Sequence, residues 1–429
     1  MKKTITTLVA GLLTTLMSVG EEKPPNIVVI ISDDQAYHDY SFMGHEVIET
    51  PHIDKLAEES LLYERGYVTT ALCCPSLATM LTGMYPHQHG YTGNDPQPYP
   101  GERHPSSQLR NKWADHFKTM PQFPALLQKA DYLSLHTGKY WQGHPSVSGF
   151  THNMGATMRN GSKKSLNIGR EGLQPIYDFI EEAQGQEKPF MVWYAAFMPH
   201  TPHTPPERLY EKYIKKGCDD REAKYFAMVD WFDETCGELL AHLDEKQLTE
   251  DTVIFYICDN GWPTGAKGYR GHKLTPYEQG VRTPIMIKWP GKVQAKRDTV
   301  SLASNLDLVP TLLNVAGVDA PEVLEGIDLL DRKAVAQRKA IFLEDFTHDM
   351  VAPDNDEGTI EARGIVKGFW KYLETYDRDP KTLEIKRRRN FLFDLEKDPM
   401  EKKDLLKDNP ELVKKLKKEM DDWYDPIIR

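Results

Sequence analysis

Oxygen-bearing side chains follow two apolar runs of the sequence, at the points where buried strands would end. Asp33 and Asp34 come directly after one run, and Asp259 and Asn260 follow close behind another. Open α/β sheets place their sites at the carboxyl ends of strands, so these four side chains would converge if the two strands are neighbours. Converging carboxylates repel one another unless a cation such as Ca²⁺ or Mg²⁺ neutralises them. The sequence therefore predicts a metal site, and the alternative is that Asp33 and Asn260 only cap turns.

Cations and an imidazole are predicted to reach the same edge of the sheet. Lys139 follows a glycine turn, His200 follows a long apolar run, and Lys273 precedes another run. A lone lysine is usually a solvated surface residue, and a lone histidine is usually structural. Placed together beside a metal, these groups would bind a tetrahedral anion and protonate a leaving group.

A nucleophile is available in the segment 72–83. Pro75 and Ser76 favour the start of a short helix, and Gly83 can end it, so Cys73 would lie at the positive end of that helix. This position is expected to lower the pKa of the thiol and to attract an oxyanion. The adjacent residue is Cys74, and neighbouring cysteines bridge each other only with severe strain. We therefore interpret Cys73 as a nucleophile candidate rather than half of a disulfide.

The elements that must position these residues can be read from apolar periodicity. Runs rich in β-branched and aromatic residues, without polar alternation, are typical of parallel strands buried on both faces, and they occur at 26–32, 189–197, 252–257 and 284–289. Between the second and third runs, apolar residues over 223–243 recur at three- and four-residue steps, which indicates a helix. The order strand, helix, strand predicts an α/β domain over 24–340, with a large, mostly parallel central sheet flanked by helices.

The remaining residues, 341–429, predict a smaller α+β subdomain. Short strands in hairpin style are expected at 341–343, 364–366, 370–373 and 390–394. A helix capped by Asn409, with Pro410 at its first position, follows them. The length of 429 residues fits two or three domains of about 150 residues each.

Composition and the first residues limit the function classes. There are 53 basic and 64 acidic side chains, a net charge of −11, which argues against a general nucleic-acid binder. Residues 1–20 have a basic start, an apolar stretch and small residues at Ser18 and Gly20, which predict a signal peptide cleaved near Gly20. The alternative is a short N-terminal anchor. No later run is apolar enough for a membrane helix, so we expect a soluble bacterial protein that is periplasmic or secreted.

Several motifs together resemble those of the type I sulfatases, in the alkaline phosphatase superfamily. The sequence CCPS at 73–76, followed by LTG at 81–83 and YPHQHG at 85–90, looks like the family signature. Further stretches are similar to family motifs in the same order, at 26–35, 138–139, 199–202, 259–261, 273–284 and 392–399. The resemblance covers most of the chain and implies an alkaline phosphatase-like fold.

The resemblance also implies a mechanism. A maturation enzyme would oxidise Cys73 to formylglycine (3-oxoalanine), whose hydrate would coordinate Ca²⁺ and attack the sulfur of a sulfate ester. After one hydroxyl is sulfated, the other could expel sulfate by re-forming the aldehyde. Lys139 and Lys273 would bind sulfate oxygens, and His200 would be the leaving-group acid or a sulfate contact. The implied metal ligands are Asp33, Asp34, Asp259, Asn260 and the modified Cys73, with Mg²⁺ as an alternative to Ca²⁺.

Two positions depart from the family pattern. Leu77 stands where the family usually has an arginine that maturation enzymes read and that helps to hold the aldehyde hydrate. Trp141 stands where a histidine that binds sulfate is often found. Other histidines are candidates to replace that ligand, namely His87, His136, His144 and His203. Because the metal ligands, the cysteine, both lysines and His200 are retained, we favour an active variant.

Cationic segments suggest the substrate class. Residues 94–121 are predicted to form a loop insertion that carries Arg103, His104, Arg110 and Lys112, and further cations lie between Arg159 and Arg170. Such charges usually belong to a solvated face, and the alternative is that they meet a polyanionic saccharide. We still favour a sulfated carbohydrate substrate, because an exported hydrolase with cationic loops suits a polyanion that cannot enter the cell. Two rival functions stay open: a phosphodiesterase or phosphonate hydrolase of the same superfamily, and a non-catalytic glycan-binding pseudosulfatase.

Overall fold

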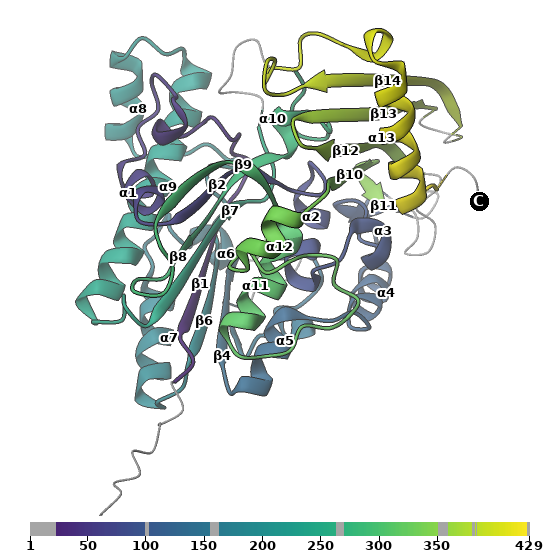
Figure 1. Ribbon diagram of the computed structural model, residues 1–429. Coiled ribbons are helices and arrows are strands. Elements are labelled where there is room, and N and C mark those ends of the chain that lie inside the picture. Colours follow the sequence, from purple (N-terminus) through teal and green to yellow (C-terminus); the bar gives the residue numbers. More distant parts are fainter. Residues whose placement is uncertain are drawn as a thin grey trace, which may run out of the picture.

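A computed structural model describes residues 23–98, 103–154, 163–262, 270–350, 359–379, 382 and 384–426 (Figure 1). The predicted signal peptide and Arg159 lie outside these residues. A large sheet with the strand order β5-β4-β6-β1-β7-β8-β2-β9 runs through the first part of the chain. Its strands are β1 (Asn26–Ser32), β2 (Leu61–Tyr67), β4 (Leu133–Gly138), β5 (His152–Asn153), β6 (Phe190–Ala195), β7 (Thr252–Cys258), β8 (Arg282–Lys288) and β9 (Lys296–Ser304).

The centre of this sheet is parallel, as the sequence predicted. Strand β1 pairs in parallel with both β6 and β7, and Ser32 lies opposite Cys258 in the register. The two strands that end in acidic residues are therefore direct neighbours, and Asp33 leaves the sheet level with Asp259. Strand β8 is antiparallel to β7 and β2, so the sheet is mixed but mostly parallel. The strands β2 and β9 were missed because charged residues interrupt their apolar pattern.

Alternate residues of each central strand pack into different layers, which is why these strands read as continuous apolar runs. In β1, Ile27 and Val29 belong to the core layer that includes residues of the helices α2 (Cys73–Thr82), α5 (Phe123–Leu127) and α11 (Leu308–Val315). Val28 and Ile30 belong to the opposite layer, with residues of α1 (Pro51–Glu58), α7 (Gln174–Gly185) and α9 (Asp220–Glu245). Figure 1 shows the sheet between these two groups of helices. Burial of each such side chain contributes about 1.5–3 kcal/mol to folding, which makes the sheet a rigid platform.

The helices around the sheet begin and end at recognisable residues. The helix predicted at 223–243 is α9, and it starts with a capping box between Asp219 and Glu222. The helices of the two layers are α1 (Pro51–Glu58), α2 (Cys73–Thr82), α5 (Phe123–Leu127), α7 (Gln174–Gly185), α8 (Glu207–Lys215), α9 (Asp220–Glu245), α11 (Leu308–Val315) and α12 (Arg332–Gln337). Short helices α3 (Pro86–His89), α6 (Lys163–Asn167) and α10 (Glu278–Val281) complete this part.

The predicted loop insertion at 94–121 is wrong in its centre. Residues Ser107–Phe117 form helix α4, and the side chain of Ser106 caps it by accepting a hydrogen bond from the backbone of Leu109. Leu109, Trp113 and Phe117 recur at four-residue steps and are buried. This spacing is the period of a helix, but the cationic residues between them made the segment resemble a loop. Arg110 forms an ion pair with Asp95 at 2.9 Å, so this cation does not remain free for a substrate.

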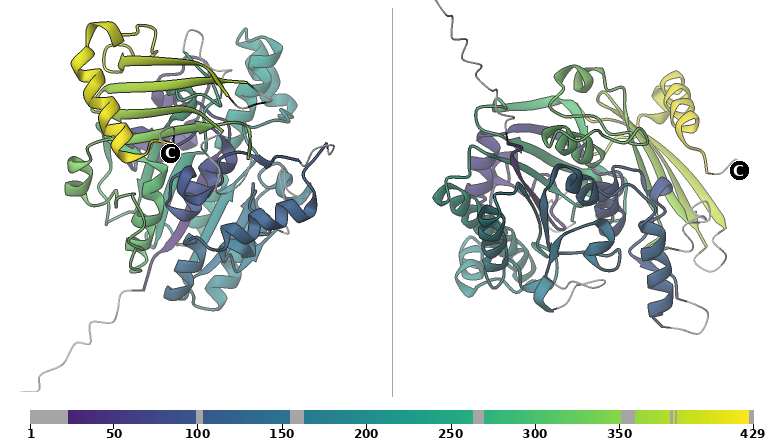
Figure 2. Two further views of the ribbon diagram at one scale, coloured as in Figure 1. Left: turned by 90° about the vertical axis from the view of Figure 1, so that its right-hand side faces the viewer. Right: turned by 90° about the horizontal axis from the view of Figure 1, so that it is seen from below.

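A second, antiparallel sheet forms near the C-terminus in the predicted hairpin style. Its strand order is β10-β12-β13-β14, from the strands Ile341–Phe346, Ile360–Lys367, Trp370–Arg378 and Ile385–Asp394. Helix α13 (Pro410–Trp423) packs Leu416 and Met420 against this sheet, and Figure 2 shows the helix along its outer side. Pro410 begins the helix as predicted, but the side chain of Asn409 does not cap it. Asn409 instead donates its side-chain amide to the carbonyl of Leu405 at 3.1 Å.

Buried contacts join the two sheets. Lys371 of β13 pairs with Glu278 of α10 at 3.1 Å and with Glu401 at 3.0 Å, and its side chain is fully buried. A two-stranded parallel pair, β3 (Asp95–Pro96) with β11 (Asp349–Met350), adds a second connection. No helix in the described part of the chain is long and apolar enough to cross a membrane.

Candidate active site

The thiol of Cys73 lies at the first residue of α2, as predicted. Leu72 is extended before the helix, and Gly83 ends it in the left-handed conformation with φ +69°. The backbone of the next residue is held separately, because Cys74 donates its N–H to the side chain of Asn94 at 3.0 Å. Cys73 is 1% exposed, and its Sγ lies 2.8 Å from the Nζ of Lys273. All five cysteines are described, and none forms a disulfide.

The acidic residues meet where β1 and β7 end. Asp34 has φ +61°, a conformation that costs a non-glycine residue about 1–3 kcal/mol. Its N–H donates to Oδ1 of Asp259 at 3.2 Å, and its own Oδ1 accepts the Nδ2 of Asn260 at 2.6 Å. These contacts from the neighbouring strand hold the strained turn in place. Among the described residues, three buried oxygens of this group have no hydrogen-bond partner: Asp33 Oδ2, Asp34 Oδ2 and Asn260 Oδ1.

Both predicted lysines reach the carboxylates. Lys139 Nζ lies 2.6 Å from Asp33 Oδ1 and 3.4 Å from Asp259 Oδ2, and Lys273 Nζ lies 2.5 Å from Asp34 Oδ1. Three carboxylates thus face two ammonium groups, which leaves a negative balance. Lys139 is delivered by a turn at Gly138 that requires glycine, because a Cβ there would lie 1.9 Å from the carbonyl oxygen of Ala195.

Burial and charge move the pKa values in this cluster in different directions. Burial raises the pKa of Cys73 to about 12, against the opposing effects of Lys139 and Lys273. The expectation of a lowered thiol pKa is therefore wrong, because desolvation outweighs the two nearby cations. Burial and the neighbouring Asp33 raise the pKa of Asp259 to about 7. Asp34 is equally buried, but the nearby cations, with Lys273 foremost, lower its pKa to about 2.

His200 lies at the open side of the cluster. Its Nε2 is 3.5 Å from Asp34 Oδ2, and its Nδ1 is 2.6 Å from the carbonyl oxygen of Thr201. Because a carbonyl can only accept, the proton of the neutral ring resides on Nδ1, and Nε2 faces the carboxylate. Burial, together with Lys139, lowers the pKa of His200 to about 4. One ligand atom each from Asp33, Asp34, Cys73 and His200 lies within 4.8 Å of the others.

Arg170 holds the loop that carries this histidine. Its guanidinium donates to the carbonyl of Phe197 at 2.7 Å and to the hydroxyl of Thr204 at 3.0 Å, on both sides of His200. The sequence placed Arg170 among cations that could meet a substrate. The structure shows instead that these donors bind protein groups, so Arg170 belongs neither to a solvated face nor to a set of free cations.

The two departures from the family pattern are hydrophobic neighbours of the site. Leu77 is 2% exposed and belongs to the main core, so no guanidinium takes its place on α2. The ring of Trp141 lies 6.0 Å from Lys139 Nζ, and the ring of Phe197 lies 5.8 Å from the same atom. Aromatic faces attract a cation, so these rings help to fix the ammonium group.

The histidines considered as replacements have different surroundings. His136 is buried with Nε2 3.1 Å from the carbonyl oxygen of Lys139, His144 contacts Ser146, and His87 pairs with Glu344 at 2.9 Å. His203 packs on Tyr225, with ring centroids 5.7 Å apart. The hydroxyl of Tyr225 donates to the backbone carbonyl of Asp34 at 3.1 Å. His203 is thus connected to the cluster through a residue that sequence reasoning missed and that no motif singles out.

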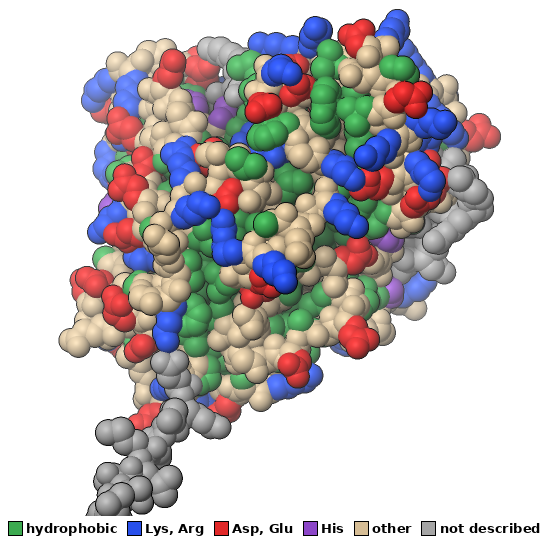
Figure 3. Space-filling view, viewed as in Figure 1, with side chains coloured by type: hydrophobic (Ala, Val, Ile, Leu, Met, Phe, Trp, Pro, Cys, Tyr) green, Lys and Arg blue, Asp and Glu red, His purple; other side chains and the backbone are tan. Residues whose placement is uncertain are grey.

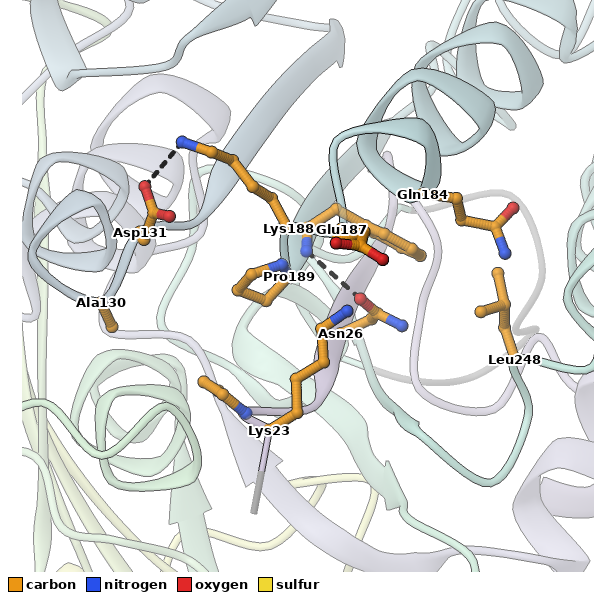
Figure 4. A pocket seen from close by; sticks show the side chains of 11 residues that line it. Lys23, Asn26, Ala130, Asp131, Gln184, Glu187, Lys188, Pro189 and Leu248 are labelled. Atoms are coloured by element: carbon orange, nitrogen blue, oxygen red, sulfur yellow. Dashed lines mark hydrogen bonds and ion pairs between the residues drawn. The ribbon is translucent and has the colours of Figure 1, made fainter. Parts of the chain in front are cut away.

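A pocket at the opposite edge of the sheet provides a contrast. Figure 4 shows this pocket, where β1 and β6 begin. Lys188 and Asp131 form an ion pair at 2.7 Å in its wall, and Asn26 accepts a backbone hydrogen bond from Phe190. Its described lining contains no cysteine, serine, threonine or histidine and no cluster of carboxylates. The carboxyl edge of the sheet is therefore the candidate active site.

This fold and site define a hydrolase of the alkaline phosphatase-like superfamily. The family model described as Sulfatase matches residues 25–318, and a model described as N-sulphoglucosamine sulphohydrolase, C-terminal, matches residues 265–425. The chain belongs to the sulfatase family. The resemblance stated from the motifs, the expected fold class and the class of sulfuric ester hydrolase are thereby confirmed.

Individual relatives agree with this assignment. Human arylsulfatase A is 30% identical over 371 residues, which cover 74% of this chain and 69% of the relative. An N-acetylgalactosamine-6-O-sulfatase of Bacteroides thetaiotaomicron is 25% identical, with 91% of each chain covered. The crystal structure of Ps i-CgsB in complex with k-i-k-neocarrahexaose has a TM-score of 0.74 and 24% identity, covering 94% of this chain and 93% of that one.

Proposed function

We propose that this protein is an exported sulfatase that removes sulfate from a sulfated carbohydrate, with residue 73 as the nucleophile after its conversion to formylglycine. The observation that carries the proposal is the convergence at Cys73. Its Sγ is 2.8 Å from the Nζ of Lys273, and the same Nζ is 2.5 Å from Asp34. The nucleophile position is thus buried and lies in contact with a cation, which in turn contacts the carboxylate cluster. Transfer of a sulfuryl group requires these three components together.

A divalent cation fits the residues present. The three partnerless oxygens of Asp33, Asp34 and Asn260 are hard ligands, buried, and directed into a group with an excess of negative charge. Asp33, Asp34, Asp259, Asn260 and the modified residue 73 would hold the ion, and we assign it to Ca²⁺ with Mg²⁺ as the alternative. When bound, the cation supplies positive charge against the sulfate oxygens, and formylglycine supplies a hydrated aldehyde as the nucleophile.

The remaining residues bind the sulfate group and handle the proton. Lys273 and Lys139 each have an ammonium group inside the cluster, where low dielectric strengthens their attraction for sulfate oxygens and for charge that develops on them. The Nε2 of His200 faces this point while its Nδ1 is fixed by Thr201. Because Nε2 carries no proton in the neutral ring, donation to the leaving oxygen requires the imidazolium form; we assign His200 to that role, with a sulfate contact as the alternative. Arg170 positions the histidine by holding the carbonyl of Phe197.

A sulfated saccharide is the substrate class that the relatives favour. The Bacteroides relative is named for N-acetylgalactosamine 6-O-sulfate, and the structural neighbour was solved with a neocarrahexaose. The predicted signal peptide at 1–20 implies export, which suits a polymer that cannot enter the cell. A maturation enzyme that oxidises Cys73 is a necessary partner in this proposal.

Mass spectrometry and a matched pair of substrates test the proposed function. Protein purified from a host with the maturation enzyme should carry formylglycine at residue 73 and should turn over a sulfate ester faster than the phosphate ester with the same leaving group. Cys74→Ser is the matched control, since Cys74 is adjacent and equally buried, and it should keep activity while Cys73→Ser loses it. Confirmed modification without sulfate release would refute the proposal and favour a binding protein. A preference for the phosphate ester would favour the phosphodiesterase alternative.

A panel of sulfated sugars tests the substrate class separately. Release of sulfate from sulfated mono- or oligosaccharides, measured by ion chromatography, is the expected result. Turnover of small aryl sulfates alone would contradict a carbohydrate substrate.

A further inference from the structure

An arginine near the active-site lysine has an unusual environment. The guanidinium of Arg270 lies over three aromatic rings, at 4.5 Å from the centroid of Phe391, 4.8 Å from Tyr277 and 5.6 Å from Phe393. The rings of Phe391 and Phe393 are themselves stacked, with centroids 6.0 Å apart. Arg270 precedes Lys273 by three residues, whereas both phenylalanines belong to β14 of the C-terminal sheet. The second sheet therefore fixes a cation three residues before the catalytic lysine in the sequence.

The turn that places this cation is tightly constrained. Gly271 has φ +81°, and a Cβ there would lie 2.6 Å from the Cβ of Tyr277. The following backbone N–H, that of His272, donates to the hydroxyl of Thr275 at 2.9 Å. Because the turn is closed in this way, Arg270 and Lys273 keep a fixed relation to each other.

The donors of Arg270 are not used within the part of the chain that the structure describes. No hydrogen bond or ion pair joins its guanidinium to another described residue, whereas Arg282, Arg338 and Arg363 are all paired with carboxylates. A cation over an aromatic ring needs no N–H donor, so these contacts do not use the hydrogen-bonding groups of Arg270. Those N–H groups are the ones that bind sulfate or carboxylate groups through parallel hydrogen bonds.

Further cationic side chains lie along β14, beyond Phe391. Side chains two residues apart share a face of a strand, so Arg389 and Arg387 lie on the face that carries Phe391 and Phe393. Arg389 pairs with Asp377 at 2.7 Å, while Arg387 is exposed and has no partner among the described residues. β14 is an edge strand, and in Figure 3 Lys and Arg side chains lie among Asp and Glu side chains over this part of the molecule.

We propose that Arg270 binds a second oxyanion of the substrate, on a sugar next to the one that loses its sulfate, and that Arg387 extends this binding site outward. The ligand class is an oligosaccharide with a sulfate or a carboxylate on the neighbouring residue. This inference rests on the proposed function, because it takes the saccharide to enter at Lys273. It adds a requirement that the proposed function does not make, namely a preference for substrates with more than one anionic group.

Binding measurements on the full chain test this inference without turnover. In Cys73→Ala protein with Ca²⁺ present, calorimetry would give the Kd of three oligosaccharides of equal length: one with a single sulfate, one with two sulfates, and one with a sulfate and a carboxylate. We expect Arg270→Ala to reduce the preference for the doubly charged ligands about tenfold. Arg387→Ala should reduce it two- to threefold, since that side chain is exposed and screened by water.

Controls separate binding from folding and from the proposed function. Arg208→Ala, on α8 in an exposed pair with Glu234, should leave the preference unchanged. Arg270→Lys keeps the charge without the planar fork and should fall between the parent protein and Arg270→Ala. An unchanged preference in Arg270→Ala would overturn the inference. A lack of sulfate release by modified wild-type protein would refute the proposed function instead, and the two failures are therefore distinguishable. Whether the sulfate or the carboxylate ligand loses more affinity identifies the second group.

Discussion

Two clusters of charge, one fully buried and one partly exposed, have the same formal composition and opposite character. At the active site, the carboxylates of Asp33, Asp34 and Asp259 face Lys139 and Lys273. In the C-terminal unit, three carboxylates face Arg363 and Lys417, and they belong to Glu374, Asp421 and Asp425. Each cluster therefore has three acids and two cations.

Satisfaction of hydrogen bonds distinguishes the clusters. Every nitrogen of the Arg363 guanidinium is bonded, including contacts at 2.7 Å to the carbonyl of Tyr424 and at 2.8 Å to Glu374. In the C-terminal cluster, no buried carboxylate oxygen lacks a hydrogen-bond partner among the described residues. In the active site, Asp33 and Asp34 each have one buried oxygen without such a partner. The difference shows that charge count alone does not identify a functional site. Asp39, Asp345 and Glu401 also have one such buried oxygen each. What sets the active site apart is that three of these oxygens, from Asp33, Asp34 and Asn260, lie in one cluster, as the proposed cation site requires.

The first way to break the comparison is to remove the nucleophile. Cys73→Ala should lower kcat/KM for a sulfate ester by about 10⁴-fold or more, because no other group in the cluster can form the covalent bond. The free energy of unfolding should change much less, since the thiol contributes little beyond its own burial. Cys74→Ala provides the comparison for loss of a buried thiol at the neighbouring position. Comparable activity of Cys73→Ala and wild type would remove residue 73 from the mechanism.

The second change breaks the C-terminal cluster. Arg363→Met should destabilise the protein by about 3–5 kcal/mol, because it leaves Glu374 buried without its main cation. Urea unfolding followed by circular dichroism measures this effect. Arg208→Ala, in an exposed ion pair, should cost about 1 kcal/mol or less. If Arg363→Met unfolded like the exposed control, the C-terminal cluster would not have the stabilising role that its geometry indicates.

The third change reduces the negative charge at the active site. Asp259→Asn keeps an oxygen for the N–H of Asp34 but removes one of three like charges. We expect kcat/KM to fall by about 100-fold, while the metal-free protein becomes as stable as wild type or more stable, since a repulsion is relieved. Thermal unfolding with a chelator and with added Ca²⁺ measures both states. The Ca²⁺-induced rise in Tm should be smaller in the variant than in wild type. An equal rise in both proteins would exclude Asp259 as a ligand.

The sequence permitted more of this site to be predicted than of its surroundings. The ends of β1 and β7 were recognisable because strands buried on both faces leave continuous apolar runs, and Asp34 and Asp259 mark where those runs stop. Strand β2 was not predicted because Glu64 and Arg65 interrupt its apolar pattern. Helix α4 was not predicted because the segment is rich in cations and proline, which are typical of loops, although Leu109 and Trp113 have helical spacing. The pairing of neighbouring strands, which brings the acids together, depends on the whole sheet and is not contained in any motif.

Electrostatic properties were the least predictable from the sequence. A position at a helix start suggested a lowered thiol pKa for Cys73, but burial dominates and raises it. The orientation of His200 depends on a carbonyl one residue away, and the attachment of its loop depends on Arg170, which is separated from it by 30 positions. Arg363 and its partners carry no motif, since their role depends only on three-dimensional packing.

The smallest expected effect is the pH dependence of the stability that Glu374 contributes to the C-terminal cluster. Burial alone would raise the pKa of Glu374, but hydrogen bonds from Tyr376 and Arg363 lower it to about 2, from an ordinary value of 4.5. A carboxyl whose pKa is depressed in the folded state stabilises the protein above pH 4.5, and this contribution disappears as pH falls toward 2. The full contribution is about 3 kcal/mol, of which roughly 1 kcal/mol should be lost by pH 4. The measurement is the difference in unfolding free energy between wild type and Glu374→Gln at pH 7 and at pH 4. That difference should shrink as pH falls, because protonation removes from the wild type the charge that the variant already lacks. A difference that stays constant between these pH values would mean that Glu374 is not held as a charged partner of Arg363.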